Sequence, residues 1–469
     1  MPKILVFDPA RIVHALGRLT GDERGGIAVM MGFLFPVLLA GFGLGFEISN
    51  WYMKARAMQN AADAAVLAAA SNGEDNYDVE AKAVAARYGF VTGTNNVTVT
   101  PSNAAPCPAD PSITPPCYSV AISSAVPLFL SQLVGYTADI TLNGARQKVL
   151  TSAAVAIQTK KSQPLCMLGL DTNSNSTAIR SNGGPSTNFT GCSVMSDSAG
   201  TCNGSNLQAN YGLAHATDSG CGNKQKSDIP IVPDPYAYMA SAIPTDLPTR
   251  CSNTYSQESR HGQTWSGGTT WTGSKTLSGT ASLATNTLVC GDLRLTGDVT
   301  INAPSGAVLY IENGLLDLQG HTLQTANGSS VTIVFTGDPA STTYNHFPTD
   351  NSGGSNGVLN IEAPKTGPFP GMALYQDPSL THNVDFTYAG NSPTWDITGG
   401  TYWPNANVTI SGVVNKSSNG ADCFVMVAKD ILINGNGAFY SQTPDGSGCR
   451  NAGLNMPTAT IPGRSKLVY

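Results

Sequence analysis

Cysteines are the most chemically distinctive side chains of this 469-residue sequence, and all ten lie at or beyond residue 107. They are Cys107, Cys117, Cys166, Cys192, Cys202, Cys221, Cys251, Cys290, Cys423 and Cys449. An even number confined to one part of a chain indicates disulfides formed in an oxidising compartment. Zinc is the alternative, but there is no Cys-x-x-Cys motif and the histidines show no ligand-like spacing to the cysteines. Cys107 and Cys117, which flank a proline-rich loop, are the easiest disulfide to propose, and the other pairings stay open.

Isolated carboxylates raise the second possible chemistry, glycoside hydrolysis, which needs two carboxyl groups about 5–9.5 Å apart. The candidates are Asp292, Asp298 and Asp317, but each lies near a Gly or Asn turn, where aspartate commonly caps the backbone. The sequence contains no GxSxG, phosphate-binding glycine loop or HExxH motif. We therefore expect no catalytic, cofactor-binding or metal-binding residues, no small-molecule substrate and no enzyme. The alternative is a membrane-tethered glycan-binding or glycan-cleaving protein, in which residues 265–273 (WSGGTTWTG) stack on sugars.

Composition favours a β-rich protein outside the cytoplasm. Charged residues make up only 12% of the chain, against roughly 25% in ordinary soluble domains. The polar residues are mainly Ser, Thr and Asn, which suit turns and solvent-facing strands. The net charge is −6, and no segment has the clustered Lys and Arg that neutralise phosphates. Nucleic acid is therefore excluded as a partner.

Residues 27–46 (IAVMMGFLFPVLLAGFGLGF) contain no charge and form the strongest local signal. Twenty helical residues rising about 1.5 Å each span a hydrocarbon core of about 30 Å. We predict a single-pass anchor whose landmarks are Ile27, Pro36, Phe46, Glu47, Trp51 and Tyr52. A cleaved signal peptide and a buried core helix are weaker alternatives. Since the cysteines follow this span, the N-terminus is expected in the cytoplasm and the rest in the periplasm or at the surface.

An Ala-rich stretch without Gly or Pro follows the span and predicts that the helix continues to about residue 72. Trp51 and Tyr52 suit the aromatic belt at a membrane interface. One apolar stripe, at spacings of three and four residues, comprises Ala55, Met58, Ala62, Val66 and Ala69. Two interpretations stay open: the stripe packs on its own domain, or it receives a partner helix.

The run from Arg24 to Ala70 resembles the N-terminal segment of TadG-like proteins (TadE/TadG family) of the tight-adherence, or Flp, pilus-assembly system. The matching features are Arg-Gly before the span, Pro36 within it, Glu47 at its end, the aromatic pair, and the run QNAADAA at residues 59–65. The resemblance implies an inner-membrane component of pilus assembly or surface attachment. Its expected partners are the cytoplasmic membrane and other pilus-assembly proteins or pseudopilins.

Two departures from related patterns limit what this resemblance implies. Cleaved pilins carry Glu at the fifth mature position, but counting from Gly25 or Gly26 places Met30 or Met31 there, so we expect an uncut anchor. Some relatives carry a von Willebrand A domain with an Asp-x-Ser-x-Ser metal site. The nearest match here is Asp171 with two asparagines, and the βα alternation of that domain does not follow.

We predict an α+β chain with six parts. They are a cytoplasmic segment (1–24), the transmembrane helix (25–48), the amphipathic helix (49–72), a small mixed α/β domain (73–160), a Cys-containing loop-rich region (161–287) and an all-β domain (288–469). Within 73–160 we expect a helix at 79–88 and strands at 97–100, 118–122 and 138–142.

The last part shows apolar pairs that recur every 23 residues, which predicts a parallel β-solenoid; a β-sandwich is the alternative. The pairs are Leu293/Leu295 with Leu316/Leu318, Val308/Tyr310 with Val331/Ile333, and Val408/Ile410 with Ile431/Ile433. A loop leaving the stack is expected between Gly337 and Gly357.

Overall fold

A computed structural model describes residues 23–72, 76–107, 117–184, 186–253, 264–265, 267–351, 356–387, 394–411, 423–435, 438–440 and 447–468. The predicted cytoplasmic segment therefore lies almost wholly outside the described residues. The chain divides into two compact units: unit 1 is Met1–Lys160 with Pro462–Tyr469, and unit 2 is Lys161–Ile461. Unit 2 is thus inserted into unit 1. The six sequence-based boundaries stay predictions.

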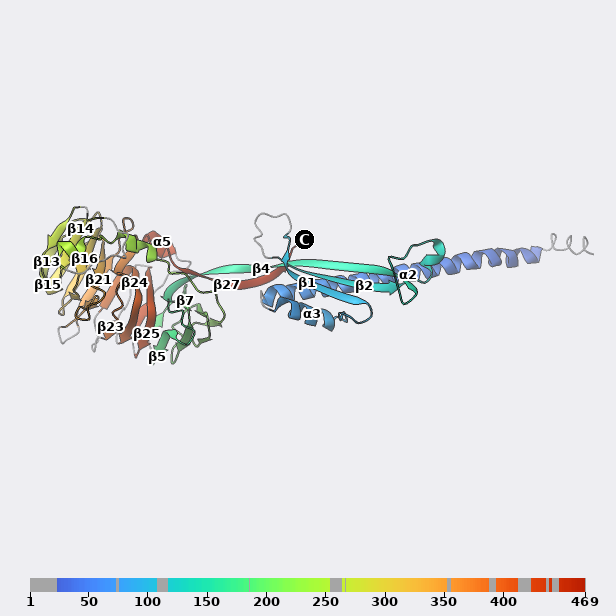
Figure 1. Ribbon diagram of the computed structural model, residues 1–469, viewed down its shortest axis with the longest axis horizontal. Helices are drawn as coiled ribbons and strands as arrows, with labels where there is room; N and C mark the ends of the chain where they lie inside the picture. The colour runs from blue at the N-terminus through green and yellow to red at the C-terminus, as the bar shows by residue number, and fades with distance from the viewer. Residues whose placement is uncertain are drawn as a thin grey trace, which may run out of the picture. The chain divides into compact units, whose positions relative to one another are not determined.

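Unit 1 is built from a long helix and an antiparallel sheet (Figure 1). Its helices are α2 (Glu23–Asn72), α3 (Tyr77–Arg87) and the short 3-10 helix η1 (Ser131–Val134). Its strands are β1 (Val97–Ala105), β2 (Cys117–Pro127), β3 (Ile140–Leu142) and the first part of β4 (Ala145–Gly169). The helix and three strands expected between residues 73 and 160 are confirmed, with longer strands than predicted.

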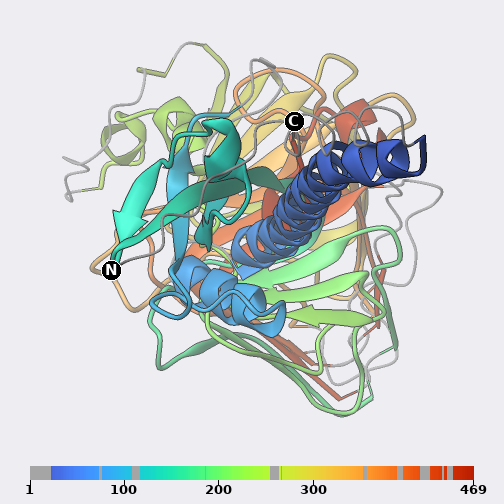
Figure 2. The ribbon, with the colours of Figure 1, turned by 90° about the vertical axis from the view of Figure 1, so that its right-hand side faces the viewer.

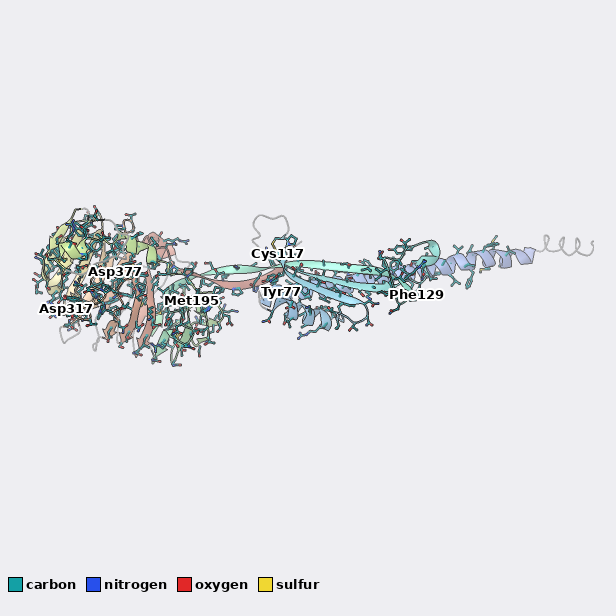
Figure 3. The ribbon with its side chains drawn as sticks, viewed as in Figure 1. Tyr77, Cys117, Phe129, Met195, Asp317 and Asp377 are labelled. Atoms are coloured by element: carbon teal, nitrogen blue, oxygen red, sulfur yellow. A yellow bond between two sulfur atoms is a disulfide. The ribbon has the colours of Figure 1, made fainter. Side chains whose placement is uncertain are left out.

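The second half of α2 packs against α3 and β2 and forms the core of unit 1 (Figure 2). Alanines dominate this part of the core, and their small side chains let the helices approach closely. Tyr77 and Tyr118 close one side, with ring centroids 6.1 Å apart (Figure 3). The uninterrupted helix follows from the Ala-rich sequence, which has the highest helix propensity.

Unit 2 consists mainly of short parallel strands, and each pair with a described register inside it is parallel. From the N-terminal side these are the end of β4, β5 (Thr177–Asn182), β6 (Ser186–Asn188), β7 (Ser193–Ser196), β8 (Ala199–Cys202), β9 (Tyr211–Ala214), β10 (Asp218–Ser219) and β11 (Lys224–Lys226). After η2 (Ala237–Ala242) and α4 (Leu247–Arg250) come β12 (Thr269–Trp271), β13 (Lys275–Ser282), β14 (Asn286–Cys290), β15 (Leu293–Asn302), β16 (Ala307–Glu312), β17 (Leu316–Asp317), β18 (Thr322–Thr325) and β19 (Val331–Thr336). The remainder are β20 (Pro348–Thr349), β21 (Val358–Glu362), β22 (Met372–Gln376), β23 (Val384–Thr387), β24 (Thr394–Ser411), β25 (Phe424–Asn434), β26 (Ala438–Tyr440), α5 (Ser447–Asn451) and β27 (Thr458–Leu467), which returns to unit 1.

One row of paired residues runs through the strands of unit 2 from coil to coil. In order it contains Leu288, Tyr310, Val334, Tyr375, Tyr402, Val427, Leu168, Met195 and Leu213. Successive parallel pairing of this kind is consistent with the predicted solenoid. The sandwich alternative requires antiparallel neighbours, which the described registers of unit 2 do not contain.

Strands from the predicted loop-rich region belong to this same stack. β25, near the end of the chain, pairs with β4 and β5, and β7, β8 and β9 continue the stack beyond them. Figure 1 shows β13 and β15 at one end of unit 2 and β5 and β7 at the other. The sequence did not reveal this because these strands are only three to six residues long and their neighbours in the stack lie more than 200 residues away.

The predicted 23-residue register is right at two places and wrong at one. Leu293 pairs with Leu316, and Val408 pairs with Ile431. Val308, however, pairs with Thr332 and Tyr310 with Val334, so that coil contains 24 residues. A shift of one residue exchanges the two faces of a strand.

The cause of this error is that β16 and β19 are buried on both faces. Residues 229–247 cover the outer face of their sheet: the Tyr310 hydroxyl contacts the Ala242 carbonyl, and the Tyr402 hydroxyl donates to Asp234 at 2.8 Å. On the other sheet, β15 alternates between buried and exposed residues, as a half-buried strand should. Apolar spacing therefore defines the register only on the uncovered sheet.

The expected loop between Gly337 and Gly357 also contributes to the stack. β20 lies within it and pairs Pro348 with Leu316 and Thr349 with Asp317. The prediction of an uninterrupted loop was wrong at this point, because a two-residue strand gives no periodic signal.

All ten cysteines form five disulfides, which confirms the predicted use of cysteine. The pairs are Cys107–Cys117 in unit 1 and, in unit 2, Cys166–Cys192, Cys202–Cys221, Cys251–Cys290 and Cys423–Cys449. The bond from Cys251 fastens the end of the covering segment to β14. Another joins the start of β25 to α5.

Candidate functional site

The first half of α2 has an apolar surface that the chain itself leaves uncovered. Ile27 is 71% exposed and Phe46 is 76% exposed, and Pro36 lies between them inside the helix. Residues 29–71 are long and apolar enough to cross a membrane. A soluble core helix would bury such side chains, so the exposed surface and the length together favour a membrane span.

Glu47 stands at the end of this apolar surface and is buried, with 5% of its surface exposed. Its carboxylate accepts hydrogen bonds from the backbone N–H groups of Phe129 (3.0 Å), Leu130 (2.9 Å) and Ser131 (2.9 Å). The Ser131 hydroxyl donates a fourth at 2.9 Å. Three of these donors are consecutive N–H groups at the start of η1, which would otherwise lack partners. Glu47 therefore fixes residues 128–135, here named the Phe129 loop, to α2.

Close packing supplements these hydrogen bonds four residues earlier on the helix. Leu130 lies against Gly43, and a methyl group at Gly43 would collide with the Leu130 Cδ1 atom. Gly41 and Gly45 have no neighbouring atom in the corresponding position. One glycine of the span is thus required by a contact, which the sequence did not single out.

An aromatic and basic group surrounds the same end of the span. The Trp51 and Tyr136 ring centroids are 5.6 Å apart, and the Lys148 ammonium lies 5.3 Å from the Tyr136 ring centroid. Lys148 also pairs with Asp139 at 3.3 Å. The contact with Tyr136 raises the pKa of Lys148, with a further contribution from Asp139. Tyr52, by contrast, is 64% exposed.

The predicted apolar stripe faces the chain's own core. Met58, Ala62, Val66 and Ala69 are fully buried in unit 1, and Ala55 is half-buried. The Ser152 hydroxyl donates to the Ala55 carbonyl, and the Gln59 amide donates to the Ala153 carbonyl. These contacts correspond to the first of the two interpretations, packing on the same domain. The partner-helix interpretation stays untested.

A comparison with protein families matches residues 25–72 to a family described as putative Flp pilus-assembly TadE/G-like. The α2 helix is a TadE/G-like segment. This match confirms the resemblance drawn from the sequence, and it covers about a tenth of the chain. Comparisons with curated proteins and with solved structures give no match. Together with the apolar surface and the disulfides, the TadE/G-like segment indicates a membrane-anchored protein with a pilus-related function.

The carboxylates considered for glycan hydrolysis bind the backbone in unit 2. Asp292 accepts from the Leu315 N–H at 3.2 Å, and Asp298 accepts from the Thr322 N–H at 2.9 Å. Asp317 is fully buried and accepts from the Gln319 and Asn351 N–H groups and from both of their side-chain amides (Figure 3). Each of these acids thus links turns of the stack.

The nearest match to a metal-dependent adhesion motif forms two local turns. Asp171 accepts from the Asn173 N–H at 3.0 Å, and Asn173 accepts from the Asn175 N–H at 3.1 Å. Among the described residues, no group of three or more His, Cys, Asp or Glu side chains is arranged to hold a metal ion.

Sequence reasoning found Glu47 and Trp51 but missed the Phe129 loop, because it lies 82 residues further along the chain. A signal for it existed in the sequence PLFLSQLVG at residues 127–135, which is short, apolar and bounded by Pro and Gly. An apolar loop of this kind has no place on an ordinary wet surface.

Proposed function

We propose that this protein is a non-enzymatic component of Flp pilus assembly or of pilus-dependent surface attachment. One helix holds it in the inner membrane, with its N-terminus in the cytoplasm. The disulfide-supported β-rich unit is presented to the periplasm or beyond. The single observation that carries the proposal is the TadE/G-like segment, whose exposed apolar surface ends at the buried Glu47.

Several features support the non-enzymatic part of this proposal. The three candidate acids accept backbone hydrogen bonds that hold neighbouring coils together, and such a role explains their positions without chemistry. The disulfides support the placement of unit 2 in an oxidising compartment.

Deletion of the gene should reduce pilus-dependent attachment, and purified full-length protein in mild detergent should leave polysaccharides uncut. Co-purification from membranes should recover other pilus-assembly proteins. Measurable depolymerisation that is abolished by Asp292→Asn or Asp317→Asn would instead favour a membrane-tethered glycan-cleaving protein. Normal attachment without the gene would contradict the proposed role.

A further inference from the structure

The Phe129 loop exposes large apolar side chains beside an apolar helix. Phe129 is 68% exposed and Val134 is 62% exposed, although they lie within one short loop of unit 1. Single exposed apolar residues are normal on a protein surface. Here, however, the two are continuous with the uncovered apolar surface of α2, to which Leu130 attaches the loop. Figure 3 shows Phe129 at this position beside α2.

The depth of the loop follows from its contact with the helix. Gly43 precedes Glu47 by four residues, which corresponds to about 6 Å along a helix that rises about 1.5 Å per residue. Gly43 lies inside the uncharged segment that ends at Phe46. Leu130 packs on this glycine, so the loop overlaps the last turn of the membrane-crossing segment and does not begin beyond it.

The backbone of the loop is suited to a region without water. In hydrocarbon, each backbone polar group needs a partner within the protein. Glu47 accepts from three successive N–H groups, Tyr136 N–H donates to the Ser131 carbonyl at 3.1 Å, and the Gln132 side chain donates to the Leu128 carbonyl. The loop therefore keeps these groups satisfied while its apolar side chains point outward.

The neighbouring side chains are those of a membrane interface. Trp51 and Tyr136 form a ring pair, and Lys148 lies over Tyr136. Aromatic rings gather at the level of lipid headgroups, and long basic side chains extend from there toward water or phosphate. The sequence of apolar loop, aromatic pair and lysine has the same order as the layers of a lipid leaflet.

We propose that the Phe129 loop is a second membrane contact, inserting Phe129 and Val134 into the leaflet from which α2 emerges. Its partner is the lipid bilayer itself. The inference rests on the proposed function only in that α2 must span a membrane. A single helix lets the attached unit rotate and tilt, whereas two contacts restrict the orientation of unit 1 on the membrane surface.

Three single-cysteine variants of the full chain test this inference: Phe42→Cys in the span, Phe129→Cys in the loop and Val79→Cys on α3. Each of the three native side chains is exposed, and the ten native cysteines are in disulfides, so only the new thiol takes a nitroxide label. The labelled proteins are reconstituted into phosphatidylethanolamine–phosphatidylglycerol vesicles. Collision of the nitroxide with oxygen, which concentrates in lipid, is compared with collision with a water-soluble nickel chelate.

The expected result is an oxygen-to-nickel collision ratio several-fold higher at positions 42 and 129 than at position 79. If position 42 reports lipid while position 129 matches position 79, the loop lies in water. The inference is then overturned, and the membrane anchor stands. If position 42 itself matches position 79, the anchor fails and the second membrane contact fails with it.

Discussion

Glu47 ends the apolar surface of α2 and also organises a distant part of the chain. Its carboxylate is buried, and each oxygen accepts two hydrogen bonds from the Phe129 loop. Hydrogen bonds to a charged acceptor contribute about 1.5–3 kcal/mol each, and removing the acceptor leaves the donors without partners. The residue that the sequence identifies as the acidic exit of the span therefore has a structural role.

Glu47→Ala should release the Phe129 loop from α2. A loss of about 2 kcal/mol in local stability corresponds to about 30-fold faster hydrogen exchange. We expect that acceleration, or more, at the Leu130 and Ser131 amides, and a smaller one in Glu47→Gln, which keeps one acceptor oxygen. Glu80→Ala, which removes an exposed carboxylate on α3, is the matched control. Equal exchange in both alanine variants would contradict this role for Glu47.

A buried acid in unit 2 gives a prediction of pH dependence. Burial raises the pKa of the Asp218 carboxyl to about 7, although the Cys221 backbone N–H opposes the rise. An unfolded aspartate titrates near pH 3.9, so the folded state binds the proton more tightly. Its contribution to stability is complete below about pH 4 and is lost as the pH rises through 7.

Asp218→Asn removes this titration, so its unfolding temperature should fall less than that of the unchanged protein between pH 4.5 and pH 8. Asp197 and Glu312, whose pKa values burial raises to about 6 and about 8, contribute with the same sign in both proteins. Asp228→Asn, at an exposed position, should keep the full pH dependence. Identical pH profiles for Asp218→Asn and the unchanged protein would refute the assignment.

At the scale of elements, α2 was predictable along its whole length while its partner loop was not. Uncharged apolar residues and then alanines specify the helix locally. The contact with Leu130 depends on a glycine at position 43, but the span contains other glycines that have no such contact. Sequence alone does not distinguish a glycine needed for packing from one that is merely tolerated in a membrane helix.

Gly43→Leu should displace Leu130 and loosen the Phe129 loop, whereas Gly41→Leu should not, since no atom occupies the corresponding space. The measurement is hydrogen exchange at the Leu130 and Ser131 amides in detergent, with an expected acceleration of about tenfold, which equals about 1.4 kcal/mol, the middle of the range for overpacking. Equal exchange rates in the two variants would show that the contact at Gly43 does not position the loop.

The parallel strands show which part of a periodic signal can be trusted. The pairing of Val408 with Ile431 follows from spacing because inward apolar residues alternate there with more exposed ones such as Asn407. For Tyr310 the same reasoning was wrong by one residue, since the covering segment makes the outer face apolar as well. A second buried face removes the alternation on which register prediction depends.

Ile410 tests the inner row of the stack, where it lies between Phe386 and Ile433 and is fully buried. Ile410→Ala should reduce the free energy of unfolding of unit 2 by about 2–5 kcal/mol through lost burial and a residual cavity. Thr409→Ala, on the opposite face of the same strand, should cost about 0.5 kcal/mol. Denaturant unfolding followed by near-UV circular dichroism measures both, and similar midpoints would exclude the proposed inner row.

At the scale of the whole molecule, the chain order differs from the stacking order. Unit 2 begins with strands that stack on its last long strand, β25, and the chain then passes along residues 229–247 before building the remaining coils. This arrangement places β4 and β27, through which the chain enters and leaves unit 2, at the two ends of a single insertion. Composition and cysteine usage indicated a β-rich, disulfide-bonded protein, but no local pattern encodes closure of the stack between residues so far apart.

The central claim is that one span divides this chain between two compartments, with the TadE/G-like segment crossing the membrane. Labelling with a membrane-impermeant maleimide tests it most directly, because native cysteines are protected in disulfides. We predict that Val79→Cys reacts in intact spheroplasts and that Thr20→Cys reacts only after lysis. Reaction of Thr20→Cys before lysis, or of Val79→Cys only after it, would contradict the account.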